Sequence, residues 1–324
     1  MKLKQRLKAT TLLSALALCL PLSAAAQSFP DKPITFVVPF GPGSATDQLA
    51  RAIGQGVTEI TGQTVVIENK PGASAMIGAA DVARATPDGY RVLITTNTTH
   101  AANQHLFKSL SYDPVKDFEP ITLLGKGGQI LVVRPDFPAK TVQELIDYAK
   151  ANPGKLTFGS GSSSSRVAGE LFKQMTGTDI LHVPYKSNPL VITDVLGGQI
   201  DLMMADMATG LPQVSSGKLK ALGVTMATPS PLAPSVPTIA SAGVPGYEMG
   251  YWFGAYVPAN TPKATVSRLH DILTNASKRD AARNFYEKTG NQHVVSTPDE
   301  LARFQAQETE KWGTVIKKAG IEPG

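Results

Sequence analysis

Two loops rich in glycine and serine could bind an anion. The first, Phe40 to Asp47, follows the apolar run 34–38, and the second, Ser160 to Ser165, follows the run 156–158. Each loop leads into a helical pattern. The first N–H groups of a helix have no intrahelical partner, and the helix dipole favours negative charge at that end. The two loops are therefore predicted to contribute to one anion site.

A carboxylate suits these loops better than a phosphate. Neither loop has the lysine of a GxxxxGK[ST] phosphate loop, and neither has a GxGxxG pattern. Gly41 and Gly43 allow close backbone approach, while Ser44 and Thr46 offer hydroxyl groups. A helix end contributes about 0.3–1 kcal/mol and a charge-assisted hydrogen bond about 1.5–3 kcal/mol, so several together can hold a small acid. The alternative is that these residues only build two tight turns.

Side chains near other strand ends extend the candidate site. Arg166 could make a bidentate contact with a carboxylate or be a solvated surface residue. Asp206 could orient a donor group of the ligand or cap a helix. Residues 96–98 end a strand and could donate hydrogen bonds, and Tyr185 could form a wall of the pocket. The candidate ligand-binding residues are Phe40, Gly41, Gly43, Ser44, Ala45, Thr46, Asp47, Thr96, Asn97, Thr98, Ser160, Gly161, Ser162, Ser163, Ser164, Ser165, Arg166, Tyr185 and Asp206.

Patterns that would indicate catalysis are weak. Ser215 and Lys218 fit SxxK, and residues 288–290 read Lys-Thr-Gly, a combination found in serine β-lactamases, but no Ser-Asp-Asn sequence accompanies them. The five histidines form no metal-binding pattern, and the one cysteine, Cys19, lies in the N-terminal apolar run. We predict no catalytic residue, metal or cofactor, and keep a periplasmic serine hydrolase as the alternative.

Residues 1–26 are predicted to be a secretory signal peptide. Four basic residues precede an apolar run that ends in Ala24-Ala25-Ala26, a typical cleavage site. These four belong to the 31 Lys and Arg of the chain, and the segment has none of the 26 Asp and Glu, so the remainder is close to neutral. The net charge of +5 therefore gives no support to a nucleic-acid partner. We expect a periplasmic protein, cleaved near Ala26.

Two repeated units must position the loops. In each unit, strand-like runs alternate with helical patterns, and this βαβαβ order predicts two α/β domains, each with a mostly parallel sheet flanked by helices. The extended segments 123–134 and 250–258 could join the domains as hinge strands. The strand-like runs are 34–38, 64–69 and 91–96 in the first unit, and 156–158, 180–185 and 199–205 in the second.

The chain is expected to form domain 1, then domain 2, and to return to domain 1. A capping box, Thr297-Pro298-Asp299-Glu300, begins the predicted C-terminal helix. The expected divisions are the signal peptide over 1–26, domain 1 over 27–126, domain 2 over 127–248, and the return of domain 1, with the C-terminal helices, over 249–324.

Many blocks of this sequence are similar to one known family. In order, over nearly the whole chain after residue 26, they are PFGPGSATDQLAR, VIENKPGASAMIGA, ATPDGYRVLITT, SYDPVKDFEPIT, GELFKQMTG, HVPYK, LGGQIDLM, GKLKALGVT and VPTIASAGVPGYE. These blocks resemble the Bug (TctC-like) family of periplasmic solute receptors, which serve tripartite tricarboxylate transporters.

The resemblance implies a type II periplasmic binding protein fold whose two domains close on an organic acid. It implies that the two loops hold one ligand carboxylate with ordered water, and that membrane permease subunits receive the ligand. Two departures stand out, since many relatives have Pro-Gly-Gly at Pro42-Gly43-Ser44 and an aspartate at Ala205. The family takes di- and tricarboxylates, aromatic acids and amino acids, so the ligand stays open. We expect a monomer, and a ligand-sensing receptor of a signalling system is the alternative.

Overall fold

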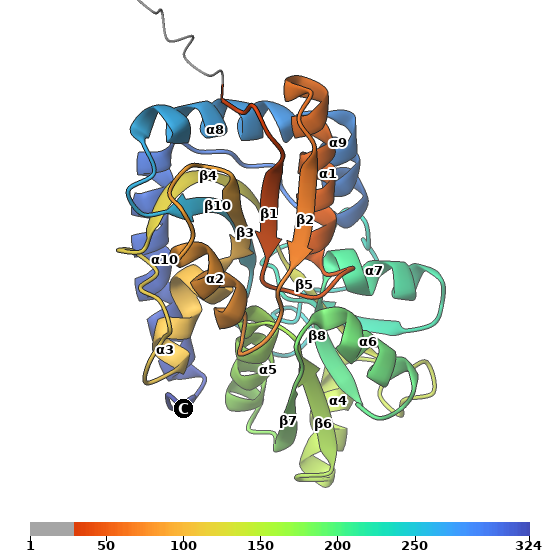
Figure 1. Ribbon diagram of the computed structural model, residues 1–324. Coiled ribbons are helices and arrows are strands. Elements are labelled where there is room, and N and C mark those ends of the chain that lie inside the picture. Colours follow the sequence, from red (N-terminus) through yellow and green to blue (C-terminus); the bar gives the residue numbers. More distant parts are fainter. Residues whose placement is uncertain (1–28) are drawn as a thin grey trace, which may run out of the picture.

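The computed structural model describes residues 29–324 as two five-stranded mixed sheets flanked by helices. Figure 1 shows one sheet and its helices above the other. The predicted signal peptide, Cys19 and the cleavage site near Ala26 lie outside the described residues. Among residues 29–324, no helix is long and apolar enough to span a membrane.

The first sheet has the strand order β2-β1-β3-β10-β4. The first three strands along the chain pair in parallel, whereas β10 runs antiparallel between β3 and β4. We call this sheet with its helices the first lobe. Its strands are β1 (Ile34–Val38), β2 (Val65–Asn69), β3 (Arg91–Thr96), β4 (Phe118–Gly127) and β10 (Tyr251–Pro258). Its helical elements are α1 (Ala45–Thr61), α2 (Met76–Ala83), η1 (Thr98–Ala102), α3 (Asn103–Leu106), α8 (Lys263–Ala276), α9 (Asp280–Thr289) and α10 (Pro298–Lys318).

The second sheet has the strand order β7-β6-β8-β5-β9 and repeats this plan, with β5 antiparallel between β8 and β9. We call it, with its helices, the second lobe. Its strands are β5 (Gln129–Val133), β6 (Leu156–Ser160), β7 (Ile180–Pro184), β8 (Leu202–Asp206) and β9 (Lys220–Val224). Its helices are α4 (Val142–Ala151), α5 (Ser163–Thr176), α6 (Asn188–Leu196) and α7 (Met207–Ser215).

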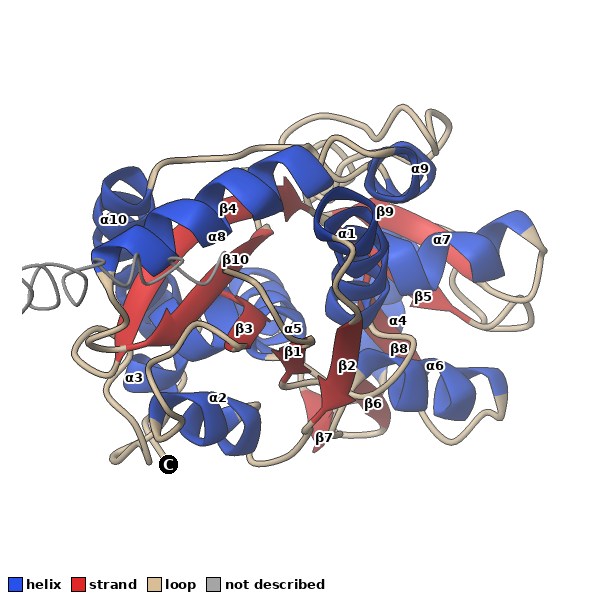
Figure 2. Cartoon of the chain, turned by 45° about the horizontal axis from the view of Figure 1, so that its top comes forward, coloured by secondary structure: helices blue, strands red, loops and turns tan. Residues whose placement is uncertain are grey.

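Helices cover both faces of each sheet, which explains why the inner strands are mostly apolar. In β1, Ile34 and Phe36 pack with residues of α1 and α8, while Val37 packs with residues of α2 on the other face. Figure 2 shows α1 and α8 on one side of the first sheet and α2 on the other. The predicted two-domain α/β fold is confirmed.

The chain passes between the lobes at two places. The first passage lies at Gly128, between β4 and β5, inside the segment 123–134 that was expected to cross. The other expected hinge segment, 250–258, does not itself cross, because β10 lies wholly within the first sheet. The return instead runs through the residues between β9 and β10. The domain boundaries drawn from the sequence stay a prediction.

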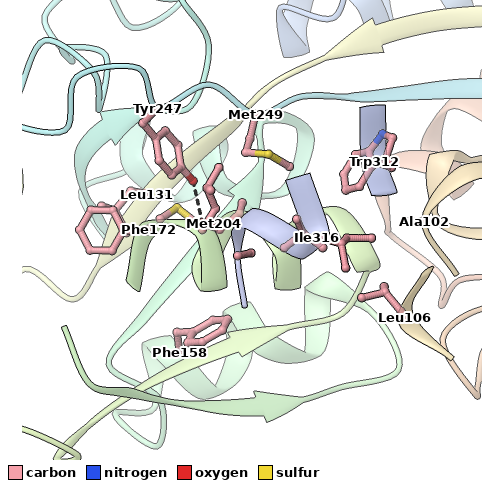
Figure 3. Packing of buried hydrophobic residues seen from close by; sticks show 14 of the residues in the cluster. Ala102, Leu106, Leu131, Phe158, Phe172, Met204, Tyr247, Met249, Trp312 and Ile316 are labelled. Carbon is pink, nitrogen blue, oxygen red and sulfur yellow. Dashed lines mark hydrogen bonds between the residues drawn. The ribbon is translucent and has the colours of Figure 1, made fainter. Parts of the chain in front are cut away.

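A continuous apolar core joins the lobes on the side of α10. Trp312 and Ile316 of α10 pack in one cluster with Leu106 of the first lobe and with Phe158 and Phe172 of the second. Figure 3 shows these side chains around the end of α10. Each is almost fully buried. Burial of a large apolar side chain contributes roughly 1.5–3 kcal/mol, so this core holds the two lobes together.

A polar contact between the lobes lies beside this core, at the start of α3. Asn103 donates from Nδ2 to the Ser74 carbonyl oxygen at 2.8 Å, and its Oδ1 accepts from Ser163 Oγ of the second lobe at 2.9 Å. At another point between the lobes, a β-carbon on Gly41 would lie 2.7 Å from Ser187 Oγ. A larger residue at position 41 would therefore require the Ser187 side chain or the lobes to shift.

The segment that Asn103 holds is strained. Ala73, Ser74 and Ala75 all have positive φ values, of 46°, 51° and 70°. This left-handed conformation costs an L-residue roughly 1–2 kcal/mol. Three such residues in succession persist because Asn103 fixes the Ser74 carbonyl and because Ala75 is buried.

Replacing exposed Ala73 by glycine is expected to stabilise the protein by about 0.5–1 kcal/mol, because glycine adopts positive φ without the β-carbon penalty. Urea unfolding measures the change. The matched control is Ala306→Gly, an exposed position inside α10, where the same substitution should destabilise by about 1 kcal/mol. A loss of stability in both variants would contradict the strained conformation of residues 73–75.

Candidate functional site

A small cavity of about 30 Å³ lies between the lobes. It stands at the carboxyl ends of β1, β3, β6 and β8, which is where open α/β sheets bind ligands. A volume of this size takes a carboxylate group or a few waters. Its lining residues are Phe40, Ser44, Ala45, Thr46, Thr96, Gly161, Ser162, Ser164, Asn188, Asp206, Tyr251 and Phe253.

The N-terminus of α1 supplies donors from the first lobe. Ser44 is the N-cap, and its Oγ accepts from the Asp47 N–H at 3.3 Å. The N–H groups of Ala45 and Thr46 precede the first intrahelical hydrogen bond, so a ligand can take them. Both residues line the cavity. The hydroxyl of Thr46 adds a further donor at the same point.

The N-terminus of α5 provides the same arrangement from the second lobe. Ser162 is the N-cap, and its Oγ accepts from the Ser165 N–H at 3.2 Å. The N–H groups of Ser163 and Ser164 are the two that lack an intrahelical acceptor. Gly161 does not share this role, because its N–H donates to Asn188 Oδ1 at 3.0 Å. The two predicted loops therefore meet at one cavity with their helix ends.

Asp206 both lines the cavity and caps a helix, so the two readings left open by the sequence are compatible. It is the N-cap of α7, where Oδ1 accepts from the Thr209 N–H at 3.0 Å. Its Oδ2 accepts from Asn188 Nδ2 at 2.6 Å. Burial raises the pKa of Asp206 above its ordinary value, and the hydrogen bonds from Asn188 and Thr209 only partly oppose that rise.

Three lining residues were missed by sequence reasoning. Asn188 begins α6 and links the α5 loop to Asp206. Tyr251 and Phe253 come from β10, whose antiparallel register places Phe253 opposite Thr96 at the carboxyl end of β3. Burial and the charge of Asp206 raise the pKa of Tyr251 well above its ordinary value, so the phenol is neutral and donates to Asn291 Oδ1. Only Asn188, directly before a proline at a helix start, carried a local signal.

Several predicted residues of the first lobe support the loop from behind the cavity. Gly43 has φ of 78° and donates its N–H to Asp47 Oδ2 at 2.9 Å. Asp47 also pairs with Arg51 and accepts from Asn69 Nδ2. Burial alone would raise the pKa of Asp47, but these partners hold it below its ordinary value. The Asp47 carboxylate thus stabilises the conformation of this loop.

Two further predicted residues, directly after β3, make their contacts outside the cavity. Asn97 Oδ1 accepts from the backbone N–H of Trp252 at 3.4 Å, and the Thr98 N–H donates to Thr96 Oγ1 at 3.2 Å. Neither Asn97 nor Thr98 lines the cavity, whereas Thr96 does. Because Thr96 accepts through its hydroxyl oxygen, its own proton is available to a ligand.

Four of the five remaining predicted residues of the second lobe make hydrogen bonds within the protein. Ser160 Oγ lies 2.7 Å from His182 Nε2, Ser165 Oγ donates to the Met204 carbonyl, and Tyr185 donates to Asp194. Ser163 Oγ makes the contact to Asn103 described above. Arg166 lies near His182, whose pKa is lowered to about 4 by burial and then by Arg166 and Lys173. Of these five, none lines the cavity, so their predicted roles in binding stay predictions.

The lining of the cavity offers hydrogen-bond donors but no basic side chain, in the part of the chain that the structure describes. Within the described part of the chain, its lining includes no Lys, Arg or His. Helix N-termini and neutral hydroxyl and N–H donors stabilise negative charge, whereas the Asp206 carboxylate in the same lining opposes it.

The residues of the hydrolase alternative lie elsewhere. Ser215 ends α7, and it and Lys218 are both exposed on either side of Gly217, whose φ is 70°. Residues 288–290 close α9, with Gly290 as its C-cap. Within residues 29–324, no three or more His, Cys, Asp or Glu side chains are grouped so that they could hold a metal ion.

Comparisons with known proteins agree with this geometry. The model of the "Tripartite tricarboxylate transporter family receptor" matches residues 49–321. A UPF0065 protein of Bordetella pertussis is 33% identical over 303 residues, which are 93% of this chain and 94% of the relative.

Three solved structures are similar in fold and sequence. Rpa4515 of R. palustris with adipate has a TM-score of 0.88 at 34% identity, and it covers 91% of this chain and 100% of that one. The periplasmic binding protein BugD has a TM-score of 0.88 at 33% identity, with the same coverage. MatC of Rhodopseudomonas palustris with bound malate has a TM-score of 0.84 at 30% identity, covering 89% and 100%. The resemblance stated from the sequence blocks is confirmed, and the chain belongs to the family of tripartite tricarboxylate transporter receptors.

Proposed function

We propose that this protein is a periplasmic receptor that binds a small organic acid between its lobes and delivers it to the membrane permease of a tripartite transporter. One observation carries the proposal: the N-termini of α1 and α5, one from each lobe, converge on a single cavity that has no basic lining residue in the described chain. The predicted signal peptide over 1–26 supports export.

The ligand is proposed to be held by one carboxylate. The N–H groups of Ala45, Thr46, Ser163 and Ser164 are the donors, together with the hydroxyls of Ser44, Thr46 and Thr96. The related Rpa4515 and MatC structures contain adipate and malate, which are both dicarboxylates, and this supports the same ligand class here. We propose that the remaining candidates from the sequence, which include Arg166 and Tyr185, either surround the bound carboxylate or stabilise the two loops.

The lobes must move apart for a ligand to enter. A cavity of about 30 Å³ takes a carboxylate but not a complete four- to six-carbon acid. Because each lobe contributes one helix end, an acid that contacts both ends binds the approached form of the lobes more tightly than a separated form. Binding therefore shifts the population toward closure, and a permease can distinguish loaded from empty receptor by that shape.

The first prediction is that small organic acids stabilise the protein. Material freed of co-purified ligand by unfolding and refolding is screened by thermal shift against succinate, malate, aspartate, glutarate, adipate and benzoate, and hits are measured by calorimetry. Saturation at 100 times Kd stabilises by about 2.7 kcal/mol, which is a clear rise in Tm. If every acid of such a panel leaves Tm unchanged, while the refolded protein has native circular dichroism, the receptor proposal fails.

The second prediction concerns Thr46. The substitution Thr46→Val keeps the shape of the side chain and removes a hydroxyl at the α1 end of the cavity. A hydrogen bond to a charged group contributes about 1.5–3 kcal/mol, so affinity for the acid found in the screen should fall at least tenfold. Calorimetry measures it.

The matched control for Thr46 lies on the same helix. Thr58 Oγ1 donates to the Gly54 carbonyl at 3.1 Å, at the far end of α1. Thr58→Val should leave affinity within about twofold of the original protein, since no ligand contact is proposed there. Equal affinity in Thr46→Val and Thr58→Val would remove Thr46 from the site.

A further inference from the structure

The cavity proposed to hold a ligand carboxylate also contains a carboxylate of the protein. Asp206 is 6% exposed and lines the cavity directly. Two protein donors reach its side chain, Asn188 Nδ2 at 2.6 Å and the Thr209 N–H at 3.0 Å. Each carboxylate oxygen can accept more than one hydrogen bond, so both oxygens keep capacity for a ligand donor.

No lining residue of the cavity, within the described chain, offers a positive charge to Asp206. A ligand carboxylate brought to the ends of α1 and α5 would therefore stand near a like charge in a site shielded from water, where repulsion is strong. Burial raises the pKa of Asp206, and the hydrogen bonds from Asn188 and Thr209 oppose that rise only in part. A hydrogen-bond donor on the ligand would stabilise the carboxylate further.

The position of the missing donor follows from the hydrogen bonds around Asn188. Asn188 Oδ1 accepts from the Gly161 N–H of the α5 loop, and its Nδ2 donates to Asp206. One amide side chain thus separates the α5 loop from Asp206. A donor that reaches Asp206 while the carboxylate contacts the α5 end must be attached close to that carboxylate.

On the basis of the proposed function, we infer that Asp206 selects organic acids that carry a hydroxyl or ammonium group on the carbon next to the bound carboxylate. The hydroxyl or ammonium donates a hydrogen bond to Asp206 while the carboxylate accepts from the helix ends. An acid of the same length without that donor leaves two negative groups facing one another. Asp206 is then the residue that distinguishes 2-hydroxy and 2-amino acids from their unsubstituted parents.

Matched series of equal chain length test this selection. Calorimetry at pH 7.5 compares succinate with malate and aspartate, and glutarate with 2-hydroxyglutarate and glutamate, as single enantiomers. In the series whose chain length the site accommodates, at least one donor-bearing acid should bind at least tenfold more tightly than its parent acid. The comparison uses the unaltered protein, so it does not depend on a variant folding.

Two variants assign the selection to one side chain. Asp206→Asn removes the charge and keeps the size, and the ratio between donor-bearing and parent acid should fall at least fivefold. Asp201→Asn is the control, because Asp201 Oδ2 also accepts from a backbone N–H, that of Thr157 at 2.8 Å, but lies outside the cavity lining. That variant should keep the original ratio.

The outcomes separate the two proposals. If parent and donor-bearing acids bind equally well to the unaltered protein, the inference about Asp206 is overturned while the receptor function stands. The same holds if Asp206→Asn binds acids with the original ratio. If none of the acids in either series or in the wider screen binds, the receptor function itself fails.

Discussion

The N-termini of α1 and of α5 meet at a common cavity, and the rest of the site depends on this convergence. In each helix a serine N-cap takes the third N–H, through Ser44 in α1 and Ser162 in α5, which leaves the two earlier groups available. Parallel strands bring each loop to the carboxyl edge of its sheet, and the two edges face one another. An anion held there needs no basic side chain, because partial charges of two helices act on it from opposite lobes.

The remaining structure keeps these two helix ends at the right separation. Helix α10 contributes Trp312 and Ile316 to an apolar core that includes residues of both lobes. Beside this core, Asn103 contacts both Ser74 in the strained segment 73–75 and Ser163 at the start of α5. The apolar core is non-directional, whereas the hydrogen bond from Ser163 to Asn103 joins the two lobes in one specific geometry.

The sequence predicted the local parts of this arrangement well. The runs 34–38 and 91–96 coincide with β1 and β3, because buried central strands are apolar and end at turn-forming residues. Both loops were recognised for the same reason, since caps and glycines are local signals. The blocks that resemble the Bug family then indicated the two-domain fold.

Residues brought in by long-range pairing were not predictable: Tyr251 and Phe253 reach the cavity only because β10 inserts antiparallel beside β3. Side-chain direction was also hidden, as Ser163 and Ser165 show by turning to Asn103 and Met204.

The most direct measurement of the central claim is an amide NMR titration with the tightest-binding acid. Backbone N–H resonances of Ala45, Thr46, Ser163 and Ser164 should shift downfield together, with one affinity, because each donates to the same carboxylate. Ala264 and Thr265, near the start of α8 and distant from the cavity, should not shift. Saturable binding that leaves the resonances of either α1 or α5 unchanged would contradict a carboxylate held jointly by the two helix ends.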